Sequence, residues 1–308
     1  MTNKPETISL YQLFQRFPDE EAARQYFEKN RWGGDVNCPH CGSLSVAEVR
    51  DQKPMPYRCR DCRQHFSVRT GTVLAESRLP LLKWLMAIYM MTTARKGIPS
   101  TQMARELGIT QKSAWFLAQR IRETWLSQGD SNDMGPTVEI DETYIGGKET
   151  NKHAKKKLNA GRGAVGKTPV VGIKDRRGVV RAAKMPNTGR HALHNFIVSN
   201  VVAGATVVTD EHAGYRGLLN YTHLTVNHSA KEFVNGMAHT NGIESFWALL
   251  KRGYYGIYHF MSVKHLDRYV AEFANRQNTI DLGTMEFIGL TVKNMHGRHI
   301  SYKELING

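Results

Sequence analysis

All four cysteines of the chain fall into two close pairs, Cys38-Pro-His-Cys41 and Cys59-Arg-Asp-Cys62, with 17 residues between the pairs. Each Cys-X-X-Cys turn presents two thiolates on one side, and four sulfurs fill the tetrahedral shell of a structural zinc ion. Disulfide bonds are the poorer interpretation, because the N-terminus shows no secretion signal. The pattern predicts a zinc ribbon, a small domain that needs metal because it cannot build a sufficient core.

Two helical regions flank the predicted ribbon, at residues 1–32 and 73–130. In the second region Gly108 separates two helical patterns, and Thr110 is placed to cap the later one, which is the order of a helix-turn-helix. A plain pair of packing helices is the alternative. Recognition helices contact bases with their first residues. We therefore expect DNA contacts from Gln111, Lys112 and Ser113, followed on the same helix by Gln119, Arg120 and Arg122.

Three segments in the second half of the chain carry carboxylates in a context that suggests a function. A short strand pattern is centred on Asp141, and a later apolar run ends in Asp210. A helical segment then carries Glu244 and Lys251, which lie seven residues apart and so nearly on one face. Glu142 is expected to point away from Asp141, because side chains alternate along a strand. An ordinary surface Glu and Lys is the alternative for the helix, but the whole constellation predicts one divalent-metal site.

The formal charge of the 308 residues is +14, which favours a polyanionic partner, nucleic acid first and an anionic membrane second. No apolar run is long enough to span a membrane, and we expect a soluble cytoplasmic protein. Between residues 146 and 184, twelve Lys and Arg stand against two acidic residues, so this segment carries +10. Such a run is usually a solvated loop. Its place directly after the strand of Asp141 favours DNA-backbone contacts from Lys155, Lys156, Lys157, Arg162 and Lys167.

The segment Gly161–Thr168, GRGAVGKT, matches the phosphate-loop pattern GxxxxGK[ST]. That loop binds phosphate when it follows a strand and opens a helix, so that backbone amides and the helix dipole meet the anion. Here the preceding residues show no strand pattern, and the following PVVGIKD reads as a strand. We therefore expect a flexible basic loop in place of a nucleotide site.

The order of elements after residue 131 is three strands in a meander, a helix, a strand ending in Asp210, and a helix carrying Glu244. This is the order of an RNase H-like domain, an α/β fold with a mixed sheet between helices. With its cysteine pairs, the chain resembles the insertion-sequence DDE transposases that carry an N-terminal zinc ribbon and an acid triad extended by lysine. The matching segments are FSVRTGT at 66–72, DETYIGG at 141–147, TDEH at 209–212, HTNGIESFW at 239–247 and LKR at 250–252.

The resemblance implies a domain order and a set of metal ligands. The domains are N-terminal helices at 1–32, a zinc ribbon at 33–72, a helix-turn-helix-like domain at 73–130, and an RNase H-like catalytic domain at 131–308. Two Mg²⁺ ions about 4 Å apart, or Mn²⁺ in their place, would clamp a phosphodiester. Asp141 would bridge both ions, and Asp210 and Glu244 would each complete one. Asn241 is the alternative helix ligand, because some relatives carry Asn or His in place of the third acid. Lys251 would hold a phosphate.

The function implied is that of a DNA transposase, which cuts at the ends of an insertion sequence and transfers the freed 3′-OH to target DNA. An RNase H-like nuclease or resolvase, or a catalytically inert sequence-specific DNA-binding regulator, is the alternative. The expected partners are the terminal repeats of the element, the target DNA, and at least a second copy of the chain, since two ends must be synapsed. Such a protein would work in the bacterial or archaeal cytoplasm, in association with the nucleoid.

Overall fold

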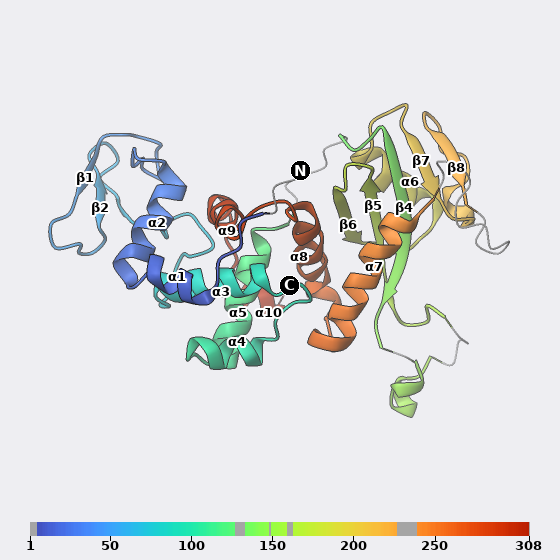
Figure 1. The fold of residues 1–308 in the computed structure, drawn as a ribbon, viewed down its shortest axis with the longest axis horizontal. Helices are drawn as coiled ribbons and strands as arrows, with labels where there is room; N and C mark the ends of the chain where they lie inside the picture. Colours follow the sequence, from blue (N-terminus) through green and yellow to red (C-terminus); the bar gives the residue numbers. More distant parts are fainter. Residues whose placement is uncertain (1–4, 127–132, 148, 159–162, 227–238, 308) are drawn as a thin grey trace. The chain divides into compact units, whose positions relative to one another are not determined.

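The computed structural model describes residues 5–126, 133–147, 149–158, 163–226 and 239–307 (Figure 1). Contacts within the chain form two compact units, Met1–Trp125 together with Asp281–Gly308, and Leu126–Ile280. The finer division into four domains stays a prediction. No helix in the described part of the chain is long and apolar enough to cross a membrane.

Helices form the core of the first unit, as the periodicity of its sequence predicts. They are α1 (Leu10–Arg16), α2 (Glu20–Trp32), α3 (Leu81–Thr93), α4 (Ser100–Leu107), α5 (Gln111–Glu123), α9 (Thr284–Lys293) and α10 (Tyr302–Asn307). Helix α2 is capped by Asp19, whose carboxylate accepts a hydrogen bond from the Ala22 amide at 2.8 Å. Apolar side chains of α2, α3 and α9 meet in one cluster, in which Phe27, Ile88 and Ile288 are fully buried.

Helices α4 and α5 have the geometry of the predicted helix-turn-helix. Gly108 ends α4 in the left-handed region with a φ of 59°, where a side chain would be strained. Thr110 begins α5, and its hydroxyl accepts a hydrogen bond from the Ser113 amide at 3.1 Å. The turn and the cap read from the sequence are therefore both present.

The cysteine pairs lie on a three-stranded antiparallel sheet with the order β1 (Val46–Glu48), β2 (Tyr57–Cys59) and β3 (His65–Phe66). Its buried core consists of two cysteines and two aromatic rings, and Trp32 of α2 packs against it. A core this small cannot stabilise a sheet by itself, which is why a ribbon of this kind depends on metal.

A five-stranded mixed sheet with the order β6-β5-β4-β7-β8 organises the second unit. Its strands are β4 (Thr137–Ile145), β5 (Thr168–Asp175), β6 (Val180–Lys184), β7 (Thr206–Thr209) and β8 (Thr222–Thr225). Strands β4, β5 and β6 form an antiparallel meander, whereas β7 and β8 run parallel to β4. The expected mixed α/β sheet is confirmed. The glycine loop leads into β5, a strand, and so lacks the helix that a phosphate loop requires.

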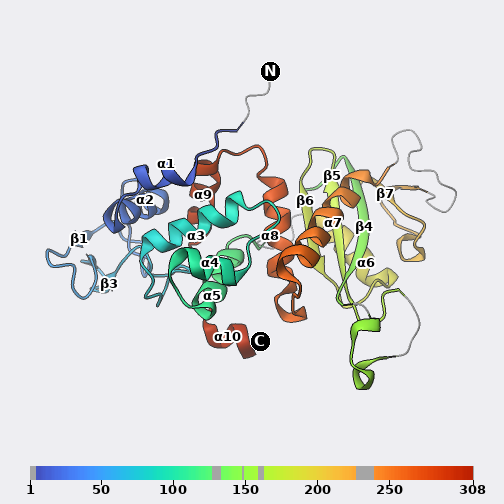
Figure 2. The same ribbon diagram turned by 60° about the horizontal axis from the view of Figure 1, so that its bottom comes forward.

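Helices cover both faces of this sheet (Figures 1 and 2). Helix α6 (Arg190–Asn200) shares a buried cluster with Val138 of β4. Helices α7 (Asn241–Gly253) and α8 (Leu266–Asn278) cover the other face, in a cluster that includes Ile145 of β4. Short helical turns complete the unit: η1 (Glu149–Asn151), η2 (Ala154–Lys156), η3 (Ala213–Tyr215), the π-helix η5 (Tyr254–Tyr258) and η6 (Val263–His265).

Candidate active site

Strand β4 sends its side chains alternately to the two faces of the sheet, and this places Asp141 under α7. Val138 belongs to the α6-side cluster and Ile145 to the α7-side cluster, so Asp141 points to the α7 side. Gly172 of β5 lies directly opposite Asp141. A Cβ at Gly172 would lie 2.7 Å from the Trp247 ring of α7, so the helix packs directly on this part of the sheet.

Parallel pairing of β4 with β7 brings Asp210 beside Asp141. The last registered pair of these strands joins Glu139 to Val208. Continued for two residues, the same register places Asp210 next to Asp141, with both side chains on the α7 face. Asp210 therefore follows the end of β7 beside the middle of β4, and the carboxyl end of a parallel strand is where ligands bind in open α/β sheets.

The buried carboxylate of Glu139 fixes the start of α7 to β4. It accepts a hydrogen bond from the Ile243 amide at 2.9 Å and forms an ion pair with Arg176 at 2.7 Å. A Cβ at Gly242 would lie 2.7 Å from this carboxylate, so glycine permits the close approach. Glu244 stands in the first turn of α7, and the attachment holds that turn over the face that carries Asp141.

The sequence prediction missed Glu139, although its position carries a signal. It lies two residues before Asp141 and so on the same face of β4. Only 3 % of its surface is exposed. A carboxylate in such a position needs hydrogen-bonding partners or a cation, and an acid within a strand of otherwise apolar character could have been read in this way.

The carboxylates near β4 lie close enough to one another for their negative charges to repel. Burial, followed by the charges of neighbouring acids, raises the pKa of Asp141 to about 7. These neighbours are Glu142, Asp210 and Glu244. The Glu142 amide donates a hydrogen bond to Asp141 at 2.8 Å, which opposes the shift. A divalent cation would remove the repulsion, and carboxylate oxygens are ligands that Mg²⁺ accepts.

Glu142 points to the opposite face from Asp141, as the alternation predicts. The Tyr215 hydroxyl donates a hydrogen bond to it at 2.7 Å, and His212 Nε2 lies 3.9 Å from its carboxylate. The His212 amide in turn donates to Asp210 at 3.0 Å. Tyr215 and His212 thus support the two strand ends that carry the aspartates.

Lys251 lies on the exposed side of α7, two turns beyond Glu244. It lines an open hollow of about 470 Å³ at the carboxyl end of β4, together with Lys167. Asn241, the alternative helix ligand, is the exposed first residue of α7. Both candidate ligands of α7 therefore stand in its first turn.

The predicted base-contacting residues stand at the start of α5, where they already make local contacts. Gln111 donates a hydrogen bond to Ser100 Oγ at 2.9 Å. The Lys112 ammonium lies 4.5 Å from the centre of the Tyr302 ring, and Ser113 takes part in the helix cap. That these side chains contact DNA stays a prediction.

The later polar residues of α5 lie in the interior of the first unit. Gln119, Arg120 and Arg122 are buried. Arg120 donates hydrogen bonds to the backbone carbonyls of Ala75 and Ile300. These three residues, which follow on the same helix, are therefore not part of an exposed face, and Arg120 instead ties two segments of the first unit to α5.

The predicted backbone contacts lie around η2 and at the start of β5. Lys155 and Lys157 are exposed, and Lys167 is half-buried. The side chain of Lys156 and the whole of Arg162 lie outside the described residues. These positions stay predictions.

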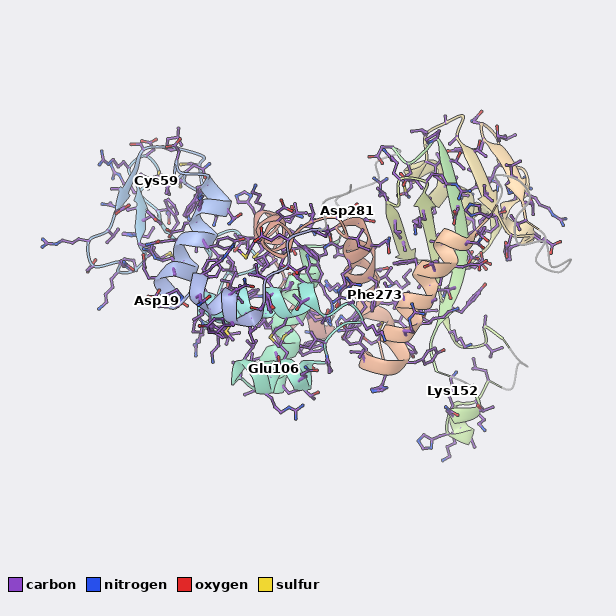
Figure 3. All side chains as sticks on the ribbon, viewed as in Figure 1. Asp19, Cys59, Glu106, Lys152, Phe273 and Asp281 are labelled. Atoms are coloured by element: carbon purple, nitrogen blue, oxygen red, sulfur yellow. The ribbon has the colours of Figure 1, made fainter. Side chains whose placement is uncertain are left out.

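The four cysteine sulfurs converge in the ribbon, where Cys59 is labelled in Figure 3. Their Sγ atoms all lie within 4.8 Å of one another, with Cys38–Cys62 and Cys41–Cys59 each at 3.6 Å. Zinc at about 2.3 Å from four tetrahedral sulfurs requires S···S distances of about 3.8 Å, so the cluster fits zinc. Among the described residues no other set of three or more such ligands converges this closely. The carboxylates around Asp141 stand further apart.

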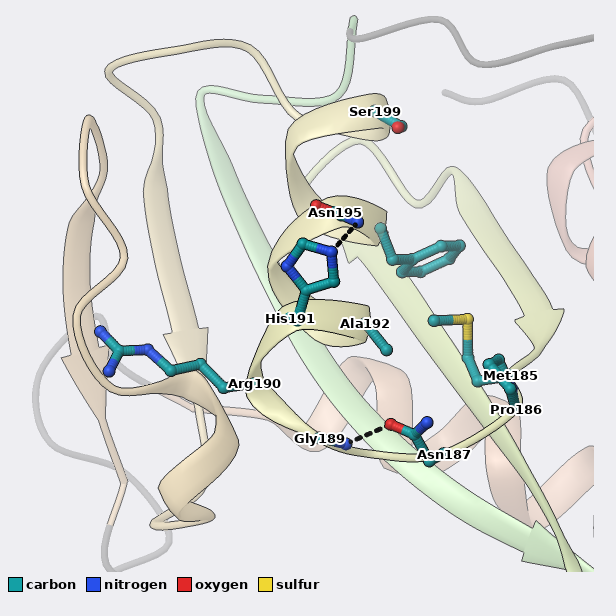
Figure 4. Close-up of a pocket in the computed structure, with 10 residues that line it drawn as sticks. Met185, Pro186, Asn187, Gly189, Arg190, His191, Ala192, Asn195 and Ser199 are labelled. Atoms are coloured by element: carbon teal, nitrogen blue, oxygen red, sulfur yellow. Dashed lines mark hydrogen bonds between the residues drawn. The ribbon is translucent and has the colours of Figure 1, made fainter.

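A second hollow, of about 620 Å³, lies along α6, which covers the other face of the sheet (Figure 4). Arg190, His191 and Asn195 line it, and Asn195 lies within hydrogen-bond distance of His191 at 3.2 Å. None of its lining residues is acidic, so this hollow offers none of the carboxylates that Mg²⁺ accepts.

Known proteins are similar to both parts of the chain. Residues 133–278 match the ISXO2-like transposase domain, and residues 18–65 match the transposase zinc-ribbon domain. The chain is 31 % identical over 252 residues to an uncharacterized protein in transposable element ISH50 from Halobacterium salinarum, and the match covers 77 % of this chain and 83 % of that protein. No solved structure matches. The two matched ranges contain the carboxylate group and the cysteine cluster.

Proposed function

Because the chain belongs to the insertion-sequence transposases with a zinc ribbon and an ISXO2-like transposase domain, we propose that it cleaves DNA at the ends of its element and transfers the freed 3′-OH to target DNA. The observation that best supports the proposal is the parallel register of β4 and β7, which brings Asp210 near Asp141 when it is continued by two residues, together with the charges of Asp210 and Glu244 felt at Asp141. Carboxylates grouped in this way support divalent-metal phosphoryl transfer.

Asp141, Asp210 and Glu244 would hold two Mg²⁺ ions, or Mn²⁺ in their place. Bound there, the ions supply activation of the attacking hydroxyl and stabilisation of the leaving oxygen in an in-line displacement. Asp141 is the ligand best placed to serve both ions, because it lies between Asp210 on the neighbouring strand and α7 on the same face. The raised pKa of Asp141 means that a proton competes with the metal for this carboxylate.

The reaction needs two successive attacks and no covalent protein intermediate. Water attacks the phosphodiester at the end of the element, which breaks the P–O bond to the 3′ oxygen and frees the 3′-OH. That hydroxyl then attacks a phosphodiester of the target by the same in-line chemistry, so that a P–O bond to the element's 3′ oxygen forms while the P–O bond to the target's 3′ oxygen breaks and the target strand leaves with a 3′-OH. Lys251 lies near the end of β4 and pairs with a non-bridging phosphate oxygen beside the reacting bond.

The remaining parts of the chain deliver DNA to this site. The start of α5 reads bases of the terminal repeats, through Gln111, Lys112 and Ser113. The basic segment that follows β4 holds phosphates. Two element ends must be brought together, so at least two copies of the chain act at once on chromosomal DNA in the nucleoid.

A joining assay tests the proposal. Purified protein, Mg²⁺ and linear DNA that ends in the repeats flanking its own gene should insert covalently into a plasmid. Asp210→Ala should abolish insertion, whereas Glu211→Ala removes an exposed neighbouring acid and should retain it. Nicking without joining would identify a nuclease or resolvase, and sequence-specific binding without chemistry would identify a regulator.

A further inference from the structure

The hollow at the carboxyl end of β4 contains an aromatic ring that the metal site does not use. Tyr255 lines this hollow of about 470 Å³ together with Lys167 and Lys251. Glu142 lines it as well, but its carboxylate already accepts the hydrogen bond from Tyr215. More than half of the tyrosine, 54 %, is exposed. An exposed aromatic ring beside two cations is the combination that binds a nucleotide unit, because bases stack on rings and phosphates pair with ammonium groups.

The segment that carries Tyr255 is held rigidly from both sides. It belongs to η5, the π-helical turn that follows α7, and such turns often occur at functional sites. Tyr254 is buried and meets Tyr255 edge to face, with the ring centres 5.0 Å apart. Tyr258, at the end of the turn, donates a hydrogen bond to the buried Glu272 at 2.8 Å. The backbone that carries Tyr255 is therefore anchored by its neighbours, while the ring itself remains exposed.

Lys167 is positioned just as firmly on the opposite side of the hollow. It directly precedes Thr168, the residue of β5 that pairs with Ile145 at the end of β4. A Cβ at Gly146 would lie 3.2 Å from the Lys167 Cα, so the two backbones are in close contact. In the described parts of the chain, neither Lys167 nor Lys251 has a carboxylate within ion-pairing distance, and both ammonium groups are available to an anion.

We propose that this hollow binds one unpaired nucleotide of the DNA end, with the base stacked on Tyr255 and the phosphates paired with Lys167 and Lys251. The inference rests on the proposed function, since it supplies the DNA end. A volume of this order is in the range that accepts a small-molecule unit. A base inside a duplex is covered on both sides by its neighbours, and the last pair of a blunt end exposes one face but remains joined to its partner base. A single unpaired base is therefore the unit that can enter the hollow and stack on Tyr255.

Binding without chemistry tests this site separately. Without added Mg²⁺, the wild type should bind a terminal-repeat duplex with a short single-stranded end about tenfold more tightly than the blunt duplex. A 2-aminopurine at the unpaired position should be quenched on binding. Tyr255→Ala should lose the preference and the quenching, while Tyr255→Phe should keep both. Phe260→Ala is the matched control, because Phe260 is 72 % exposed but does not line the hollow.

The outcomes separate this inference from the proposed function. Equal preference and quenching in Tyr255→Ala and wild type would overturn the nucleotide site, even if wild type joins DNA. An equal loss in Tyr255→Phe and Tyr255→Ala, with both variants folded by circular dichroism, would also overturn it. A Tyr255-dependent preference without any Asp210-dependent joining would instead keep the nucleotide site and reject the transposase mechanism.

Discussion

At the scale of single residues, two acids on one face of β4 differ in what surrounds their charge. Glu139 is buried, and an amide and an arginine satisfy it. Asp141, two residues later, faces other carboxylates, and burial with their repulsion raises its pKa to about 7. The first acid therefore stabilises the fold, whereas the second stores a repulsion that a cation relieves.

Mg²⁺ should raise the unfolding temperature more at about pH 8 than at about pH 5.5. The pKa of Asp141 is raised from 3.8 to about 7, so its ionisation destabilises the folded apo-protein as pH rises toward 7. Mg²⁺ binds the ionised form, and its stabilisation is lost as pH falls below that pKa. Thermal unfolding with and without Mg²⁺ measures this, and Asp141→Asn should show little shift. A wild-type shift that is equal at both pH values would contradict the prediction.

Replacing Glu139 should loosen α7 as well as destabilise the second unit. Glu139→Ala removes the acceptor of the Ile243 amide and the carboxylate that pairs with Arg176, and we expect a loss of about 2–3 kcal/mol in the free energy of unfolding. Glu139→Gln keeps one acceptor and should lose less. Urea unfolding measures both variants, with Glu211→Ala as the exposed-acid control. Strand joining should fall most in Glu139→Ala, less in Glu139→Gln and not in Glu211→Ala. Full joining by Glu139→Ala would show that Glu139 does not position α7.

At the scale of elements, the sequence predicts α7 but not where it touches the sheet. The stripe Ile243, Phe246, Trp247 and Leu250 follows the helical period and is buried as that period requires. The order of strands and the cap of α5 were likewise readable from local patterns.

Contacts of Gly172 and Gly242 depend on which strand neighbours which, a long-range property that no local pattern contains. The burial of Arg120 could not be predicted for the same reason, because the carbonyl groups that accept its hydrogen bonds, those of Ala75 and Ile300, lie far away in sequence.

Gly172→Ala should displace α7 from the sheet. The added Cβ would meet the Trp247 ring at 2.7 Å, and overpacking of this kind costs about 1–3 kcal/mol. Urea unfolding should show that loss, and Mg²⁺-dependent stabilisation should weaken because Glu244 moves with the helix. Gly147→Ala is the control, since its Cβ would meet nothing within 4 Å. Unchanged stability in Gly172→Ala would mean that the Trp247 ring moves aside at no cost.

At the scale of the whole molecule, the positive charge is unevenly distributed. The second unit has a net charge of +7, although residues 146–184 within it carry +10, so the rest of that unit is net −3. The acids that would bind metal therefore belong to a part of the unit that is net negative, and a strongly basic segment follows the strand of Asp141 in the sequence. This distribution favours the basic segment, together with Lys251 of α7, for contacts with the DNA backbone, while base contacts by the start of α5 stay a prediction.

Removing three charges from that segment should change the salt dependence of DNA binding. Each phosphate contact adds about 0.9 to the slope of log K against log salt, so glutamine at Lys155, Lys156 and Lys157 together should lower the slope by about 2–3. Fluorescence anisotropy across a salt series measures it. The control replaces the exposed Lys29, Lys96 and Lys293 of the first unit, which removes the same charge. Equal slope changes in the two triple variants would show that net charge, and not contact by the segment, governs binding.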